Sequence, residues 1–358
     1  MLDAGVDALL PHSYPPLRAC LPDTFSVSDA GAKGKGLFAR RHIRNMEVIL
    51  TERPAVITPY IMAVAAPSPQ LYADIFGKLS KDVYNTLVDF EAHKSMDHES
   101  LIRVNALAIP LSVPDYEYAE LPTHRGIFLQ TGRCNHSCGP NAKWDWDLSS
   151  FSLTLSAVRE IRVGEEITIA YVPLHLPQKE REASLRDMYD FSCVCEFCAQ
   201  SSDEINKSDS ARKFLAKFWY PEVSCIPSFE DWCKDDSLPS DMLLNAHKDA
   251  MNAILQEGLH VLDTECTSGH VHPQRDLGRH IDKIAMCYGA MEDIVNFRAW
   301  TQKALDTREY TGHDTKLVFK KWLSNPASFP CWGWRTHPSK VSNPDARSSM
   351  DSRKIMPP

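Results

Sequence analysis

The amino-acid sequence predicts an α+β protein, and three features of the sequence lead to that prediction. Apolar and polar residues alternate over residues 23–58 and 126–171, which is typical of half-buried strands. Apolar residues recur at three- and four-residue spacing over residues 68–109, 241–262 and 277–307, which is typical of amphipathic helices. Three closely spaced cysteines follow the second strand-rich stretch, and they indicate a metal site.

The first strand-rich stretch is expected to hold two or three strands around a glycine-rich turn. Phe25 and Val27 alternate with polar neighbours, and a compact apolar run at residues 48–50 stands before Pro54. The turn between them is marked by three glycines in quick succession: Gly31, Gly34 and Gly36.

The second strand-rich stretch is expected to end in a β-hairpin. Its first strand carries apolar residues at every second position: Phe151, Leu153, Leu155 and Ala157. Residues 163–165 form a turn, and beyond it Ile167 and Ile169 alternate with their neighbours. We therefore expect the strands on the two sides of this turn to pair with each other.

The helical stretches are expected to form an insertion and a C-terminal region. The insertion, at about residues 60–125, interrupts the strand-rich domain. A charged segment at residues 178–188 predicts a short helix that leads into the cysteines, and residues 201–210 predict a polar linker. The tail after Thr336 is rich in Ser, Pro, Lys and Arg, so we expect it to be disordered.

The composition is that of an ordinary intracellular protein with a mildly acidic charge. Of the 358 residues, 43% are hydrophobic, and the formal net charge is -8. This charge argues against direct nucleic-acid binding and suits a basic partner such as a lysine-rich peptide, although mild acidity also serves solubility alone. The most apolar stretch, residues 60–66, is far shorter than the roughly 20 residues of a membrane span. The N-terminus lacks the basic and apolar parts of a signal peptide.

The cysteines indicate a metal site rather than a framework of disulfides. The chain has 11 cysteines, an odd and unevenly spaced set. Three of the four ligands that structural zinc prefers are supplied by one C-x-C-x-x-C run: Cys193, Cys195 and Cys198. The fourth ligand has three candidates in an earlier segment: Cys134, His136 and Cys138. Three free thiols or a redox-active pair are the alternatives.

Residues 133–142 read Arg-Cys-Asn-His-Ser-Cys-Gly-Pro-Asn-Ala, and alone they predict a loop because Gly-Pro-Asn is a strong turn signal. This segment resembles the Asn-His-Ser-Cys-x-Pro-Asn motif of SET-domain methyltransferases. Residues 33–39, residues 164–171, and Phe191 with the C-x-C-x-x-C run resemble three further motifs of that family in the same order. The helical regions are similar to the SET and MYND-domain branch and its fungal relatives. The MYND finger is absent, because no cysteine lies between Cys20 and Cys134.

The resemblance implies an α+β fold: a β-rich SET domain with a helical insertion and a knot-like cofactor site, a post-SET zinc segment, and a helical C-terminal region. The implied organisation is an N-terminal lead at 1–22, the SET domain at 23–171 with its insertion at about 60–125, the post-SET segment at 172–200, the helical region at 201–335 and the tail at 336–358. Zinc binding would then tie the post-SET segment to the cofactor loop, so metal binding and active-site assembly become one event.

The resemblance also implies site residues. Tyr171 is the expected catalytic residue, with its hydroxyl beside the transferring methyl group, although alone it would be an ordinary tyrosine at a strand end. The expected residues for S-adenosylmethionine are Lys33, Gly34, Lys35, Gly36, Leu37, Asn105, Asn135, His136, Tyr171 and Phe191. Among them, Lys33 is expected to pair with the cofactor carboxylate and Phe191 to stack near the adenine. In the family the motif cysteine completes the zinc site, so the implied ligands are Cys138, Cys193, Cys195 and Cys198.

Together these features predict a protein-lysine N-methyltransferase that uses S-adenosyl-L-methionine and holds Zn(2+). Its substrate is expected to be a protein that presents a lysine, histone or non-histone, in the nucleus or cytoplasm, and the chain is expected to be monomeric. The alternative is a catalytically weak SET-like scaffold that binds a partner protein through its C-terminal helices. A zinc-dependent DNA-binding protein is disfavoured, because the chain is acidic and its cysteine spacing fits no finger with a recognition helix.

Overall fold

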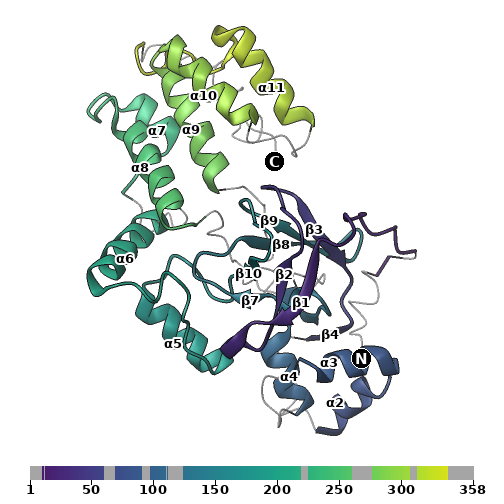
Figure 1. Cartoon of the computed structure of the whole chain (residues 1–358). Coiled ribbons are helices and arrows are strands. Elements are labelled where there is room, and N and C mark those ends of the chain that lie inside the picture. Colours follow the sequence, from purple (N-terminus) through teal and green to yellow (C-terminus); the bar gives the residue numbers. More distant parts are fainter. Residues whose placement is uncertain are drawn as a thin grey trace. The chain divides into compact units, whose positions relative to one another are not determined.

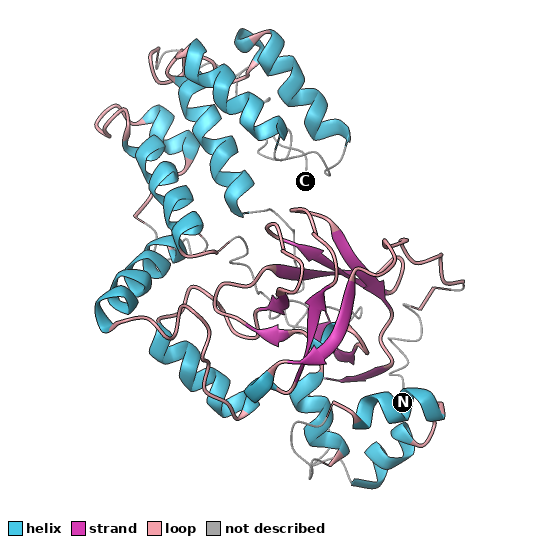
Figure 2. Cartoon of the chain, viewed as in Figure 1, coloured by secondary structure: helices cyan, strands magenta, loops and turns pink. Residues whose placement is uncertain are grey.

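The computed structural model of the chain divides into two compact units (Figure 1). The first unit comprises Met1–Leu174, Gln178–Gln200 and Asp263–Pro273, and the second comprises His175–Pro177, Ser201–Leu262 and Gln274–Pro358. The residues that the structure describes are 10–11, 13–59, 69–90, 97–109, 111, 124–218, 225–259, 276–306 and 313–337. Figure 2 shows the described strands in the first unit and only helices in the second, which confirms the predicted α+β class.

The strands of the first unit form three small sheets. They are β1 (Phe25–Asp29), β2 (Lys35–Ala39), β3 (Val48–Glu52), β4 (Val56–Pro59), β5 (Leu107–Ile109), β6 (His124–Ile127), β7 (Asn135–His136), β8 (Ala142–Asp147), β9 (Ser152–Ala157) and β10 (Glu166–Ile169). The strand orders are β1-β2-β10-β7, β3-β9-β8 and β4-β6-β5. Two 3-10 turns, η1 (Gly31–Lys33) and η2 (Thr131–Arg133), precede β2 and β7.

Apolar residues of most of these strands meet in one hydrophobic core. Leu37 of β2 pairs in register with Ile167 of β10, and both side chains are fully buried. Leu153 and Leu155 of β9 are buried in the same cluster. Burial of each such side chain contributes about 1.5–3 kcal/mol, so this core fixes the strands that carry the polar site residues.

The described part of the insertion contains the helices α2 (Pro69–Phe76), α3 (Lys81–Val88) and α4 (His98–Asn105), which Figure 1 shows together beside β4. Ser80 and Asp97 begin α3 and α4, because each side chain accepts a hydrogen bond from a backbone N–H of the first turn. The helices share a small core with β4 and β6, in which Phe76, Leu87 and Ile102 cluster with Val56 and Ile127.

The predicted hairpin between β9 and β10 is wrong. Strand β9 pairs with β3 and β8, whereas β10 pairs antiparallel with β2 and parallel with β7. Between the two strands the chain crosses to another sheet, and Ile161 forms an isolated bridge with Ile43 on the way. Alternation identified both strands correctly, but it carries no information about which strand pairs with which.

After the sheets, the charged segment forms a helix as predicted, α5 (Gln178–Tyr189), and this helix belongs to the first unit. The second unit contains α6 (Ser202–Ala216), α7 (Phe229–Lys234), α8 (Met242–Gln256), α9 (Asp276–Ala290), α10 (Ile294–Asp306), α11 (His313–Ser324) and the turn η4 (Pro326–Ser328). Helix α9 packs against α7, α8 and α10, and α10 packs against α11. Their core is rich in aromatic rings, among them Trp232, Phe297, Phe319, Trp322 and Phe329.

The polar linker predicted at residues 201–210 is wrong, because this segment forms most of α6. Ser201 and Glu204 make a reciprocal capping box at the start of the helix. One turn before the end of α6, Arg212 is fully buried, and its Nε lies 3.4 Å from a carboxylate oxygen of Glu257. The polar residues of this segment therefore cap the start of a helix and form a buried ion pair, and they do not form an exposed linker.

Two sequence-based expectations lie outside the described residues: the apolar stretch at 60–66 and the disordered tail beyond residue 337. Among the residues that are described, none of the helices combines the length and the apolar character that a membrane crossing requires.

A pair of buried histidines joins α8 to α9 in the second unit. The Nδ1 atoms of His247 and His280 are 2.8 Å apart, and both side chains are buried. Burial, together with the charge of His280, lowers the pKa of His247 to about 2. Burial, together with the charge of Arg279, lowers the pKa of His280 to about 3. Both imidazoles are therefore neutral in the folded protein at neutral pH.

The pair predicts that acid destabilises the second unit. The unfolded chain binds these protons near pH 6.5, whereas the folded chain resists them down to about pH 3. Stability is thus fully present above pH 6.5 and falls on acidification by up to about 1.4 kcal/mol per pH unit for each histidine. The midpoint of urea unfolding, followed by tryptophan fluorescence, should fall between pH 7 and pH 5.

The matched control for this prediction is His247→Gln, which removes one of the two buried imidazoles. This variant should lose less stability over the same pH range than the wild type does. An equal loss in both proteins would show that other groups control the acid sensitivity.

Candidate functional site

The site forms where two segments from different parts of the sequence run side by side. Strand β7 pairs in parallel with β10, with Asn135 opposite Thr168 and His136 opposite Ile169. The backbone N–H of Tyr171, just beyond β10, donates to Nδ1 of His136 at 3.0 Å. The Asn-His-Ser-Cys segment and the segment from β10 to Tyr171 therefore lie side by side.

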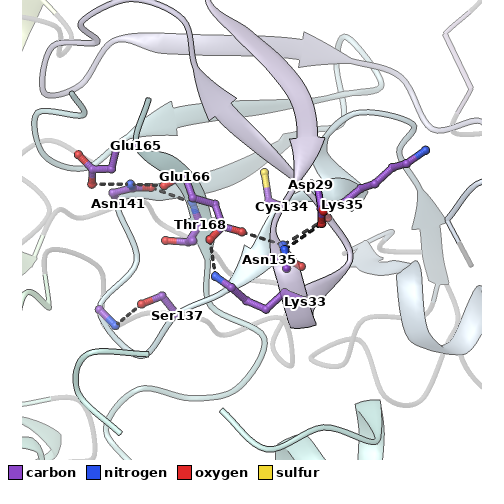
Figure 3. Close-up of polar contacts among 12 residues, drawn as sticks. Asp29, Lys33, Lys35, Cys134, Asn135, Ser137, Asn141, Glu165, Glu166 and Thr168 are labelled. Atoms are coloured by element: carbon purple, nitrogen blue, oxygen red, sulfur yellow. Dashed lines mark hydrogen bonds and ion pairs between the residues drawn. The ribbon is translucent and has the colours of Figure 1, made fainter. Parts of the chain in front are cut away.

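The buried side chain of Asn141 stabilises the pairing of β7 with β10. Its side-chain Nδ2 donates to the carboxylate of Glu165 at 3.0 Å and to the carbonyl of Glu166 at 2.8 Å, as Figure 3 shows. Its Oδ1 accepts from the backbone N–H of Thr168 at 2.8 Å. The side chain is buried, so these bonds have no competition from water. From the sequence alone, Asn141 predicted only a turn after Gly-Pro.

Two predicted cofactor residues bind the carboxylate of Glu166 (Figure 3). Lys33 forms an ion pair with its Oε2, and Asn135 Nδ2 donates to its Oε1 at 2.7 Å. Asn135 Nδ2 also lies 3.3 Å from the carbonyl of Lys35. A Cβ on Gly36 would come within 2.7 Å of Glu166 Oε1, so glycine is what admits this group. The donor set of Lys33 and Asn135 thus suits a carboxylate.

Three other predicted cofactor residues have different surroundings. Lys35 points to Asp89, with its Nζ 2.6 Å from one carboxylate oxygen. The side-chain amide of Asn105 donates to the carbonyl of Leu101 at 2.9 Å within α4. The side chain of Leu37 is fully buried in the core, so only its backbone is placed to face a ligand.

A cluster of aromatic rings surrounds Tyr171. The ring centroids of Tyr171 and Tyr189 are 4.9 Å apart, and Phe191 meets Tyr171 edge-on at 6.4 Å. The ring of His136 lies 5.5 Å from that of Tyr171. Tyr189 at the end of α5 was missed from the sequence, although it stands two residues before Phe191.

The hydroxyl of Tyr171 is held in its neutral form. It donates to the carbonyl of Cys134 at 2.7 Å. Burial raises the pKa of the Tyr171 phenol well above its usual value, and the charges of Cys134 and Tyr189 act in the same direction. At neutral pH this group is therefore a hydrogen-bonding phenol and not a base.

Four cysteines form a cluster that fits a tetrahedral metal ion. The Sγ atoms of Cys138, Cys193, Cys195 and Cys198 all lie within 4.8 Å of one another, and those of Cys138 and Cys198 are 3.5 Å apart. Zinc with four sulfur ligands at about 2.3 Å spaces them about 3.8 Å apart, so the cluster matches. A Cβ on Gly139 would overlap the ring of Phe197, so this glycine lets the C-x-C-x-x-C run dock on the loop of Cys138.

The structure thus brings together some of the predicted residues and separates others. Lys33, Gly36 and Asn135 meet at Glu166, whereas His136, Tyr171 and Phe191 meet in the aromatic cluster. The four cysteines converge as a third group, 3.4 Å from His136 Nε2 through Cys138. Glu166 was not predicted as a site residue, because it follows a turn glycine and a second glutamate, a pattern typical of the exposed face of a strand.

Residues 34–172 match the family model of the SET domain. This chain carries a SET domain. The matched region contains the paired strands β7 and β10 with Asn141, Glu166 and Tyr171, whereas α5 and the C-x-C-x-x-C run follow it.

Curated relatives agree with the SET domain over parts of their length. Histone-lysine N-methyltransferase set5 of Schizosaccharomyces pombe is 30% identical over 58% of this chain and 59% of its own length. N-lysine methyltransferase SMYD2-B of Danio rerio is 33% identical over 45% of this chain and 37% of its own. Protein-lysine N-trimethyltransferase SMYD5 of Homo sapiens is 37% identical over 23% of this chain and 20% of its own length. The chain therefore spans less than two thirds of the length of these relatives.

Among solved structures, the SET domain of LSMT bound to lysine and AdoHcy aligns with 94% of this chain and 92% of that chain. The identity is 11% and the TM-score is 0.31, values too low to support a conclusion about this chain.

The hydrogen bonds of Asn141 predict that Asn141→Ala destabilises the first unit. Each of its three bonds contributes about 1 kcal/mol, and the groups left behind are buried, so we expect a loss of about 2–4 kcal/mol. Urea unfolding of the full chain measures this loss. Asn85→Ala, at an exposed position of α3, is the control and should change stability little. An Asn141→Ala variant as stable as the control would contradict the role of Asn141.

The cysteine cluster predicts about one zinc ion per chain by metal analysis of the purified protein. Cys195→Ser should lose this zinc, because the hydroxyl of serine is a much poorer zinc ligand than a thiolate. Cys225→Ser, which alters an exposed cysteine outside the cluster, should retain it. Retention of the metal by Cys195→Ser would show that the ligand set is wrong.

Proposed function

We propose that this chain transfers a methyl group from S-adenosylmethionine to the side-chain amine of a protein lysine. The observation that carries the proposal is the parallel pairing of β7 with β10, where the donors Lys33 and Asn135, which bind a carboxylate, lie in the same SET domain as the half-buried Tyr171. The names of the curated relatives support a lysine of a histone or another protein as the acceptor. The proposed organisation is a SET domain over residues 23–171 and a post-SET segment over 172–200, in a protein of the nucleus or cytoplasm.

The donor pair supports the proposed cofactor site. When bound, S-adenosylmethionine supplies a methyl group on a positively charged sulfur. Lys33 and Asn135 bind the carboxylate of Glu166, so their ammonium and amide groups are donors suited to a carboxylate. They would exchange Glu166 for the carboxylate of the cofactor's methionine part. We assign the backbone around Gly34 and Gly36 to the same pocket, because glycine permits close approach.

The remaining predicted residues would line the rest of this pocket. Phe191 and His136 offer ring faces near Tyr171, which suits the adenine and the methyl end of the cofactor. Lys35 and Asn105 would have to leave Asp89 and the carbonyl of Leu101, their present partners, to touch it.

The aromatic cluster supports methyl transfer to an amine. A lysine attacks only in its neutral form, and burial among apolar rings lowers the pKa of an ammonium group. The half-buried rings of Tyr171, Tyr189 and Phe191 pack against one another and supply such an apolar surface. The neutral hydroxyl of Tyr171 is fixed by the carbonyl of Cys134, so its lone pairs are left to accept weak C–H···O contacts or an amine N–H. The reaction then depends on alignment, which a rigid site supplies.

The four cysteines are proposed as the ligands of one structural zinc ion, with Cys138 supplied by the segment of Asn135 and His136. A bound zinc ion would hold the residues after Tyr171 against that segment. This arrangement would keep Tyr189 and Phe191 beside Tyr171.

Two substitutions test the proposed roles. Tyr171→Phe keeps the ring, so it should bind S-adenosylmethionine almost as the wild type does while methyl transfer falls at least about tenfold, a barrier increase of about 1.4 kcal/mol. Asn135→Ala should weaken cofactor binding itself. Calorimetric titration measures the binding, and transfer of a labelled methyl group to proteins of a cell extract measures the activity.

Tyr84→Phe, which changes a tyrosine on the surface of α3, is the matched control and should leave both quantities unchanged. A wild-type protein that does not bind S-adenosylmethionine would overturn the proposal. Binding without methylation of any protein would favour the SET-like scaffold that recognises a partner through its C-terminal helices.

A further inference from the structure

The helix α5 carries a positive charge that is almost completely buried. Arg181 is 1% exposed, and its Nε donates to Sγ of Cys138 at 3.3 Å. The side chain of Cys198 also interacts with this guanidinium and helps to raise its pKa. A buried guanidinium is costly unless an opposite charge lies beside it, so its sulfur partners matter to its presence there.

Within the cysteine cluster, the thiolate form offsets this charge, whereas the neutral thiol form does not. Four thiolates around one divalent ion carry a net charge of two minus, whereas four thiols carry none. A guanidinium beside two of these sulfur atoms offsets part of that charge through N–H···S hydrogen bonds. Arg181 is therefore matched to the metal-loaded cluster.

His136 extends the contact from the cluster to Tyr171. Its Nδ1 accepts the backbone N–H of Tyr171, so a neutral ring must carry its hydrogen on Nε2. That Nε2 lies 3.4 Å from Sγ of Cys138. Cys138 thus has Arg181 Nε and His136 Nε2 as donors, and the chain of contacts runs from α5 to the backbone of Tyr171.

The same face of α5 also reaches Tyr171 through its ring. Arg181, Leu185 and Tyr189 follow one another at four-residue spacing, which places them on one side of a helix. Leu185 is fully buried between them, and Tyr189 packs on Tyr171. A shift of α5 would therefore disturb Tyr171 in two places.

We propose that Arg181 is a positioning residue: by holding the thiolate of Cys138 it anchors α5 to the metal cluster and fixes the His136 ring that binds the backbone of Tyr171. This role rests on the zinc site of the proposed function. It concerns neither a metal ligand nor a group that touches the substrate.

The test compares Arg181→Gln, Arg181→Lys and Lys179→Gln in the full-length chain. Lys179 is exposed on the same helix, so its substitution removes one positive charge away from the cluster. Zinc release to a chromophoric chelator is the first readout. Arg181→Gln should release zinc about 10- to 100-fold faster than the wild type, as is usual when a partner of a metal ligand is lost. Arg181→Lys should release zinc at a rate between those of the wild type and Arg181→Gln. An ammonium group keeps the positive charge but lacks the planar, forked donors of a guanidinium.

Hydrogen exchange of the peptide that contains the Tyr171 amide is the second readout, since this amide donates to His136. Its exchange should be faster in Arg181→Gln and unchanged in Lys179→Gln. If Arg181→Gln does not fold, the same two comparisons are made with Arg181→Lys.

The measurements distinguish failure of the proposed zinc site from failure of the proposed role of Arg181. A wild-type protein without zinc would overturn the zinc site and this role together. A wild type with zinc, alongside an arginine variant that releases it at the wild-type rate or leaves the Tyr171 amide equally protected, would overturn only the role of Arg181.

Discussion

The parallel pairing of β7 with β10 is the constraint on which the rest of the site depends. Parallel neighbours cannot be joined by a tight turn, so the chain passes through β8 and β9 between them. The short contact between the two strands is reinforced by Asn141. Its side-chain amide donates to the carboxylate of Glu165, just before β10, and accepts from the backbone N–H of Thr168 within β10. One buried side chain thus helps to hold Asn135, His136 and Tyr171 in a common frame.

This frame explains why polar groups and the cysteine cluster occur together. Within four residues the chain passes from Asn135, which binds the Glu166 carboxylate, through His136, which binds the Tyr171 backbone, to Cys138. A displacement at any of these positions is transmitted to the other two, because the backbone between them is short. Local packing, such as Phe197 on Gly139, adds a further tie.

Local sequence signals predicted the elements well and their pairing poorly. Alternation located β9 and β10, but the partners of β10 come from β2 and β7, far away in the chain. The hydrophilic start of α6 was mistaken for a linker, because its stability comes from a capping box and from the distant Glu257. Periodicity reports the exposure of residues, whereas pairing and buried polar contacts depend on the whole fold.

The candidate site shows the same division. Spacing alone identified three cysteines, and the resemblance to a family supplied Cys138, which lies 60 residues from Cys198. Glu166, Tyr189 and Arg181 were missed, because each acts through a partner that no local pattern reveals. An arginine in a charged helix looks solvated until its burial is known.

The central claim is that the metal cluster and the cofactor pocket are one structure. It is tested most directly by measuring S-adenosylmethionine affinity calorimetrically before zinc removal by a chelator, after removal, and after zinc is restored. The claim predicts an affinity that falls at least about tenfold without zinc and recovers with it, because ordering of the segment and binding are linked. Zinc-free protein that binds S-adenosylmethionine as tightly as the zinc-loaded protein would contradict it.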